Sequence, residues 1–172
     1  MVLLGDSLFQ FYNWQQRFPG LLVVNRGIAG ETVKGLLARI TAELTHIENK
    51  DVVMFMIGAN NIVMEDYGFV GDYQSMLTKF RREKPCCRLV VTSLIPFRLP
   101  WLSPDAIFRI NNLLRKTAGQ WGADYLDIHV RLVAGESGEE RCFLEDGVHL
   151  SERGYRIWTN EVERYLSTFT EG

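Results

Sequence analysis

The chain has 172 residues, of which 47% are hydrophobic and 23% are charged, and its formal net charge is −2. These values predict one soluble globular domain over residues 1–172, with enough material for a core of its own. The slightly negative charge argues against nucleic acid as a partner, and no run reaches the roughly 18 apolar residues of a membrane span.

Short apolar runs alternate with longer amphipathic stretches from the first residue onward. Most of the short runs are continuous and rich in β-branched residues, a pattern typical of parallel strands that are covered on both faces. We predict strands at residues 2–4, 21–24, 52–57, 89–95 and 125–128.

The longer stretches carry apolar residues at helical spacing, and we predict helices around residues 33–44, 69–80, 107–121 and 155–169. Ser103 is placed as the N-cap of the third helix with Pro104 at its first position, and Ser151 is the candidate N-cap of the last. Strand and helix in alternation predict a three-layer α/β/α sandwich around a five-stranded parallel sheet with right-handed crossovers.

Four short blocks hold the residues that could take part in a chemical reaction. Each lies directly after a predicted strand or in a late loop, and ligands bind at the carboxyl edge of such a sheet. The blocks are Gly5-Asp6-Ser7-Leu8, Asn25-Arg26-Gly27-Ile28-Ala29-Gly30-Glu31-Thr32, Gly58-Ala59-Asn60-Asn61 and Asp146-Gly147-Val148-His149. Together they supply the nucleophile, oxyanion donors, base and carboxylate that acyl transfer at an ester requires.

Ser7 is the candidate nucleophile, because it follows the first strand and its side chain can stand at the sheet edge. A serine hydroxyl needs a base to attack at neutral pH. His149 is preferred, because Asp146, three residues before it, can bond one ring nitrogen while the other faces the serine. On the residues alone, His129 remains a rival base, with Asp127 two residues before it.

The four blocks resemble those of the GDSL hydrolases, also called the SGNH hydrolase superfamily. The resemblance implies a flavodoxin-like fold and an acyl-serine mechanism in which Ser7 attacks, His149 carries the proton and Asp146 orients His149. It also implies an oxyanion hole built from the backbone N–H groups of Ser7 and Gly30 and the side-chain amide of Asn60.

The substrate pocket is less clear from the sequence. The apolar loop over residues 96–102 is flanked by prolines and follows the fourth strand, so it is either a pocket wall or packing over the sheet. In the third block, family members often carry Asp where this chain has Asn61, which would change the local electrostatics. Possible pocket residues, chosen for their closeness to the motifs, are Leu8, Asn61, Ile62, Val63, Phe97, Trp101 and Val148.

The sequence therefore predicts a serine esterase that needs no metal or cofactor and acts on small-molecule esters. The resemblance implies small acyl esters as substrates, and among these we prefer short acyl groups on a carbohydrate or another polar alcohol, because the compact chain has little material for a long acyl tunnel. A lysophospholipase or thioesterase for longer acyl chains is the alternative. An acyltransferase and a non-catalytic binding module are further hypotheses.

The three cysteines, Cys86, Cys87 and Cys142, make a poor disulfide framework and lack zinc-site spacing. We expect reduced thiols, with Cys86 and Cys87 entering a buried strand. The N-terminus lacks the basic start of a signal peptide, so a cytoplasmic location is expected. The short first strand also suggests that a few residues are missing before Met1.

Overall fold

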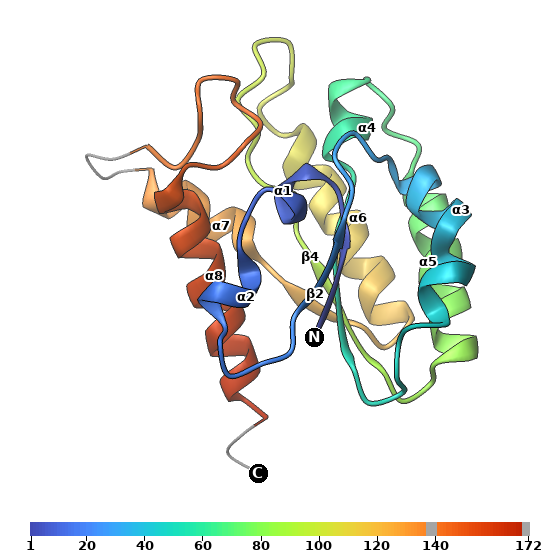
Figure 1. Ribbon diagram of the computed structural model, residues 1–172. Helices are drawn as coiled ribbons and strands as arrows, with labels where there is room; N and C mark the ends of the chain where they lie inside the picture. Colours follow the sequence, from blue (N-terminus) through green and yellow to red (C-terminus); the bar gives the residue numbers. More distant parts are fainter. Residues whose placement is uncertain (137–140, 170–172) are drawn as a thin grey trace.

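The computed structural model describes residues 1–136 and 141–169, which fold into a five-stranded parallel sheet between helices (Figure 1). The strands are β1 (Val2–Gly5), β2 (Val24–Gly27), β3 (Val52–Met56), β4 (Arg88–Thr92) and β5 (Asp124–Leu126). Their order across the sheet is β2-β1-β3-β4-β5, with every neighbouring pair parallel. This is the doubly wound, flavodoxin-like order, and it confirms the predicted fold class.

Helices cover both faces of the sheet (Figure 1). One layer contains α3 (Val33–Leu44), α5 (Val70–Glu83) and α6 (Ala106–Gln120), of which α5 packs against both others. The other contains α1 (Ser7–Gln10), α2 (Trp14–Arg17), α7 (Ile128–Gly135) and α8 (Glu152–Ser167), and α7 packs against α8. The short α4 (Ala59–Val63) stands at the upper edge, among the loops that follow the strands.

An aromatic cluster fixes α1 against the C-terminal helix. The ring of Phe9 lies 5.3 Å from that of Trp14 and 5.2 Å from that of Trp158, and the two tryptophan rings are 5.0 Å apart. All three side chains are buried. Because Ser7 is the first residue of α1, this packing also fixes the position of Ser7 relative to α8.

The central strands approach each other so closely that one position admits only glycine. Gly5, the last residue of β1, pairs with Met56 of β3. A Cβ atom at Gly5 would lie 1.9 Å from the carbonyl oxygen of Met56, far inside van der Waals contact. The turn that follows therefore begins from a tightly fixed point at the carboxyl edge of the sheet.

The second strand lies later in the chain than predicted. The apolar run at residues 21–24 is mostly exposed, and Leu22 is 79% exposed. The pairing of β1 with β2 begins at Val24 and ends with Gly5 opposite Gly27, so β2 contains polar residues instead. As an edge strand, β2 owes its position to the backbone register with β1 rather than to burial of its own side chains.

The third predicted helix lies close to its predicted range, but its N-cap differs from the predicted one. α6 starts at Ala106 with Asp105 as its N-cap residue, so Ser103 and Pro104 do not hold the predicted positions. Ser103 forms a turn before the helix, in which its carbonyl accepts the N–H of Ala106 and its hydroxyl donates to Asp105. The turn satisfies one of the free N–H groups at the start of α6, that of Ala106, and no side chain caps the helix.

The last part of the chain follows the prediction more closely. The fifth strand ends at Leu126, and Asp127 caps α7, a helix that the sequence pattern had not indicated. The N-cap of α8 is confirmed, because the Ser151 hydroxyl accepts the N–H of Gly154.

All three cysteines are free thiols, Cys86 exposed and Cys87 and Cys142 buried. None of the helices that the described residues form is long and apolar enough to cross a bilayer.

Candidate active site

Ser7 stands where β1 turns into α1, at the carboxyl edge of the sheet. Asp6 caps the helix by accepting the N–H of Leu8 at 3.1 Å, which leaves Ser7 at the first helical position. The Ser7 residue is only 6% exposed. Its backbone N–H belongs to the first helical turn, whose donors have no partner within the helix.

His149 and Asp146 come together with Ser7 in one chain of hydrogen bonds. The Nε2 atom of His149 lies 3.0 Å from the Ser7 hydroxyl, and its Nδ1 lies 2.7 Å from Oδ2 of Asp146. The other Asp146 oxygen accepts the backbone N–H groups of Val148 and His149, both at 2.9 Å. This local turn holds the carboxylate where it bonds the imidazole.

These hydrogen bonds also set the charge of Asp146. Partial burial alone would raise the pKa of its carboxyl group. The bonds from the His149 backbone, the His149 ring and the Val148 backbone outweigh that effect and lower the pKa to about 2. Asp146 is thus ionised at neutral pH and can stabilise a positive imidazole.

His129, the rival base, occupies different surroundings. Its backbone N–H donates to the Ser93 hydroxyl, and burial lowers the pKa of its ring. Asp127, the carboxylate that could have bonded the His129 ring, instead caps α7 by accepting the N–H of Val130 and pairs with Arg115. Of the two candidate bases, the structure therefore places His149 in hydrogen-bond contact with Ser7.

Gly30 and Asn60 lie at the ends of the strands that flank β1. Gly30 adopts a positive φ of 79°, and a Cβ atom there would meet no atom within 4 Å, so the space beside it is open. Asn60, in α4, donates one amide hydrogen to the carbonyl of Glu31 at 2.9 Å. An amide carries two hydrogens, so the second can serve a ligand.

A network of charges holds the turn that contains Gly30 and Glu31. Both oxygens of Glu31 accept bonds from Arg39 at 2.6 Å. Arg39 also bonds Glu43 at 2.5 Å, and Arg26 of β2 bonds the same carboxylate at 2.8 and 2.9 Å. Burial would raise the pKa of Glu43, but the two guanidinium groups lower it overall. The network makes the turn, and with it the acceptor of the Asn60 bond, a rigid part of the site.

Asp6 does more than cap α1. Its carboxyl group is fully buried, and while one oxygen accepts the N–H of Leu8, the other has no hydrogen-bond partner among the described residues. Burial raises the pKa of this carboxyl from 3.8 to about 7, against the effect of that hydrogen bond. The group thus titrates near neutrality directly beside Ser7.

The predicted pocket residues differ widely in their burial. Leu8 and Ile62 are core residues with no exposed surface. Asn61 is also buried, and its amide accepts the N–H of Val33 and donates to Asp66, so it fixes loops instead of facing a ligand. Trp101 is 47% exposed and lines a cavity. The others are Val63, which is exposed, Val148, which is half-buried, and Phe97, which is nearly buried.

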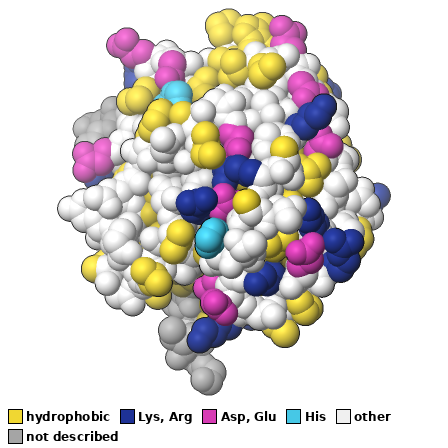
Figure 2. Space-filling model, turned by 45° about the vertical axis from the view of Figure 1, so that its right-hand side comes forward, with side chains coloured by type: hydrophobic (Ala, Val, Ile, Leu, Met, Phe, Trp, Pro, Cys, Tyr) yellow, Lys and Arg dark blue, Asp and Glu magenta, His cyan; other side chains and the backbone are white. Residues whose placement is uncertain are grey.

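Two features of the site have no counterpart in the sequence prediction. The exposed ring of Phe11 lies 5.5 Å from the ring of His149, a contact that no motif indicates. Figure 2 shows further apolar side chains gathered at the top of the molecule, the end where Figure 1 places α4. Exposed apolar residues from segments that follow the strands are Phe11, Ile28, Val63, Met64, Tyr67 and Trp101.

No group of three or more His, Cys, Asp or Glu side chains is placed to hold a metal ion within residues 1–136 and 141–169.

Known proteins match this chain along most of its length. The model of the GDSL-like Lipase/Acylhydrolase family matches residues 3–157. The platelet-activating factor acetylhydrolase IB subunit alpha1 of Bos taurus is 30% identical over 162 residues, which are 90% of this chain and 69% of the bovine protein.

Solved structures share the fold. The lipase/acylhydrolase from Enterococcus faecalis has a TM-score of 0.78 at 18% identity, covering 96% of this chain and 93% of that one. The acetyl xylan esterase AlAXEase also has a TM-score of 0.78 at 18% identity, covering 95% and 98%. With the family match, the chain is shown to belong to the GDSL-like lipase/acylhydrolase family, and it is a carboxylic ester hydrolase of the GDSL type.

Proposed function

We propose that the chain is a serine esterase in which Ser7, His149 and Asp146 form the catalytic triad. The observation that carries the proposal is the unbroken chain of hydrogen bonds from the Ser7 hydroxyl through both ring nitrogens of His149 to Asp146. Those distances suit proton transfer from the hydroxyl to Nε2, with Nδ1 holding its proton toward the carboxylate. We further propose that residues 1–172 form a single domain.

In the first half of the reaction, the Ser7 oxygen attacks the carbonyl carbon of the ester as its proton moves to Nε2 of His149. The C=O double bond opens and places a negative charge on the carbonyl oxygen. When this bond reforms, the C–O bond to the alcohol breaks, and His149 gives its proton to the departing oxygen. Water then attacks the acyl-serine by the same route, which releases the acid and restores Ser7.

The oxyanion would be bound by the backbone N–H groups of Ser7 and Gly30 and by the amide of Asn60. Support comes from the position of Ser7 at the start of α1, the open space at Gly30, and the second amide hydrogen of Asn60. The bond from Asn60 to Glu31 fixes the amide before substrate arrives. Donors held in this way can each lower the barrier by about 3 kcal/mol.

For the substrate, we propose short acyl groups, above all acetyl, esterified to a carbohydrate or another polar alcohol. The names of the bovine relative and of the xylan esterase both refer to acetyl groups. The alternative is a lysophospholipase or thioesterase, which the exposed apolar residues at the top of the molecule would suit.

The serine mechanism is tested by substitution. Ser7→Ala and His149→Ala should each lower kcat by on the order of 10⁴, and the double variant should be little worse, because the two side chains act as a unit. Ser75→Ala, at an exposed serine on α5, is the matched control. A folded Ser7→Ala variant with near-normal turnover would refute the mechanism. In a separate test, the activity of the wild type should be unchanged in EDTA.

Acyl length is tested with p-nitrophenyl esters below their micelle concentrations. We expect kcat/KM to peak at about two to four acyl carbons, since each further buried CH₂ would otherwise add about 0.8 kcal/mol, or roughly fourfold. A steady rise through about eight carbons would favour the longer-chain alternative. Added alcohols that yield new esters would instead indicate an acyltransferase.

A further inference from the structure

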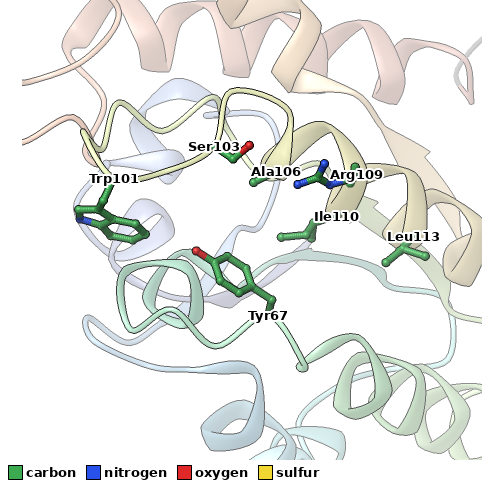
Figure 3. A pocket seen from close by; sticks show the side chains of 7 residues that line it. All are labelled: Tyr67, Trp101, Ser103, Ala106, Arg109, Ile110 and Leu113. Carbon is green, nitrogen blue, oxygen red and sulfur yellow. The ribbon is translucent and has the colours of Figure 1, made fainter.

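A cavity of about 440 Å³ lies between the segment after α4 and the start of α6 (Figure 3). Its walls include Tyr67 and Trp101 at one end and Arg109 and Leu113 at the other. The volume is within the range of small-molecule sites. An acetyl group would fill only a small part of it.

The cavity is tied on both sides to the proposed active site. Tyr67 directly follows Asp66, which Asn61 holds through bonds of 2.7 and 2.8 Å. On the other side, the loop of residues 96–105 leads to Trp101, and its Arg98 donates to the carbonyl of Gly147 at 2.8 Å. One wall thus continues from the segment of Asn60, and the loop that carries Trp101 in the other wall contacts the loop of His149 through Arg98. Figure 1 shows the loop between α4 and the loop that precedes α8.

Two aromatic side chains of the lining offer flat apolar surface to the cavity. Trp101 is 47% and Tyr67 45% exposed, and Figure 3 shows the Tyr67 hydroxyl directed toward the indole of Trp101. Such rings pack well against compounds that combine apolar C–H faces with hydroxyl groups, because each ring carries an apolar body and a polar end.

The polar side chains at the cavity are hydrogen-bonded to one another, and their charges are paired. Arg109 pairs with Asp105, one turn earlier in the chain, and Ser103 donates to the same carboxylate at 2.6 Å. An anion would have to compete with Asp105 for the guanidinium. An alkyl chain would remove water from these groups without replacing its hydrogen bonds. The hydroxyl groups of a neutral ligand can accept hydrogen bonds from Arg109 and donate them to Ser103 or Asp105.

We propose that this cavity binds the alcohol part of the ester and that this alcohol is a saccharide. The inference rests on the esterase function proposed above and adds a leaving-group subsite to it. The acyl group lies at Ser7, while the sugar ring packs on Trp101 and Tyr67 and its hydroxyl groups bond Ser103 and Arg109.

The test compares two acetate esters, a methyl glucoside monoacetate and ethyl acetate, by the rate of acid release. Trp101→Ala should lower the ratio of kcat/KM for the glucoside ester to kcat/KM for ethyl acetate by about tenfold. In the proposed subsite the sugar packs on the indole of Trp101, whereas ethanol is too small to reach it. Trp101→Phe should restore most of the ratio. Phe108→Ala is the matched control, since Phe108 is an exposed ring on α6 outside the cavity lining, and its ratio should equal that of the wild type.

Three results would each overturn the subsite. The first is an unchanged ratio in Trp101→Ala, and the second is a wild type that cleaves ethyl acetate but not the glucoside ester. The third is a selective loss of activity on ethyl octanoate in Trp101→Ala. The last would assign the cavity to the acyl chain.

Failure of the esterase function would look different, because the wild type would release acid from neither ester. A titration of methyl glucoside into the Ser7→Ala variant, followed by the NMR signal of the Trp101 indole N–H, then tests the subsite alone. A shift of that signal supports the subsite, and no shift at saturating sugar overturns it.

Discussion

The buried carboxyl group of Asp6 should make the stability of this protein fall as the pH rises toward neutrality, and Asp6→Asn should remove that effect. Burial raises the pKa of this group from 3.8 to about 7 in the folded state. In the unfolded chain the carboxyl is exposed and titrates at its ordinary value. The folded protein therefore binds the proton more tightly, so protons favour folding.

The size of the effect follows from the shift. About three pK units at 1.36 kcal/mol each give roughly 4 kcal/mol. This contribution is fully present below about pH 4, where both states are protonated, and is lost progressively as the pH rises to about 7, where the folded form ionises. Asparagine keeps the carbonyl that can accept the N–H of Leu8 but cannot ionise.

The assay is urea unfolding of the wild type and the variant at a series of pH values. The difference in their free energies of unfolding should move by about 4 kcal/mol in favour of Asp6→Asn between about pH 4 and about pH 8, because groups that do not interact with Asp6 titrate alike in both proteins and cancel. Glu48→Gln, at an exposed carboxylate, should show no such movement. A difference between wild type and Asp6→Asn that stays constant across this range would refute the reasoning.

Four further substitutions test other parts of the structure. Asn60→Ala should lower kcat by about 10²–10³ with little change in KM in steady-state kinetics, and a defect in KM alone would contradict an oxyanion role. His129→Ala should retain kcat within about tenfold, and a loss comparable to that of a triad residue would mean that the base is misassigned. Gly5→Ala should lower the free energy of unfolding by about 3 kcal/mol, because its Cβ would meet the Met56 carbonyl at 1.9 Å; a neutral effect in urea titration would contradict this close approach. Arg39→Met should lower the free energy of unfolding by about 3 kcal/mol, because two carboxylates lose their shared partner, and thermal stability equal to the wild type would contradict the network.

The sequence by itself determined the features that depend on short stretches of chain. The apolar stripe from Val33 to Leu44 is a helix of those bounds, because amphipathic spacing is a property of neighbouring turns. The bond between Asp146 and His149 spans three residues, so its spacing could be recognised without the fold. The alternation of strands and helices likewise indicated a three-layer α/β/α sandwich around a parallel sheet.

Only the tertiary structure decided which distant groups meet. The bond between Ser7 and His149 joins residues 142 positions apart, and from the residues alone His129 was still a candidate. The place of β2 was missed because backbone register with β1, not side-chain burial, sets an edge strand. The cavity between Tyr67 and Trp101, and the burial that raises the pKa of Asp6, come from packing between separate segments. Such contacts depend on the position of the whole chain in space, which no local pattern encodes.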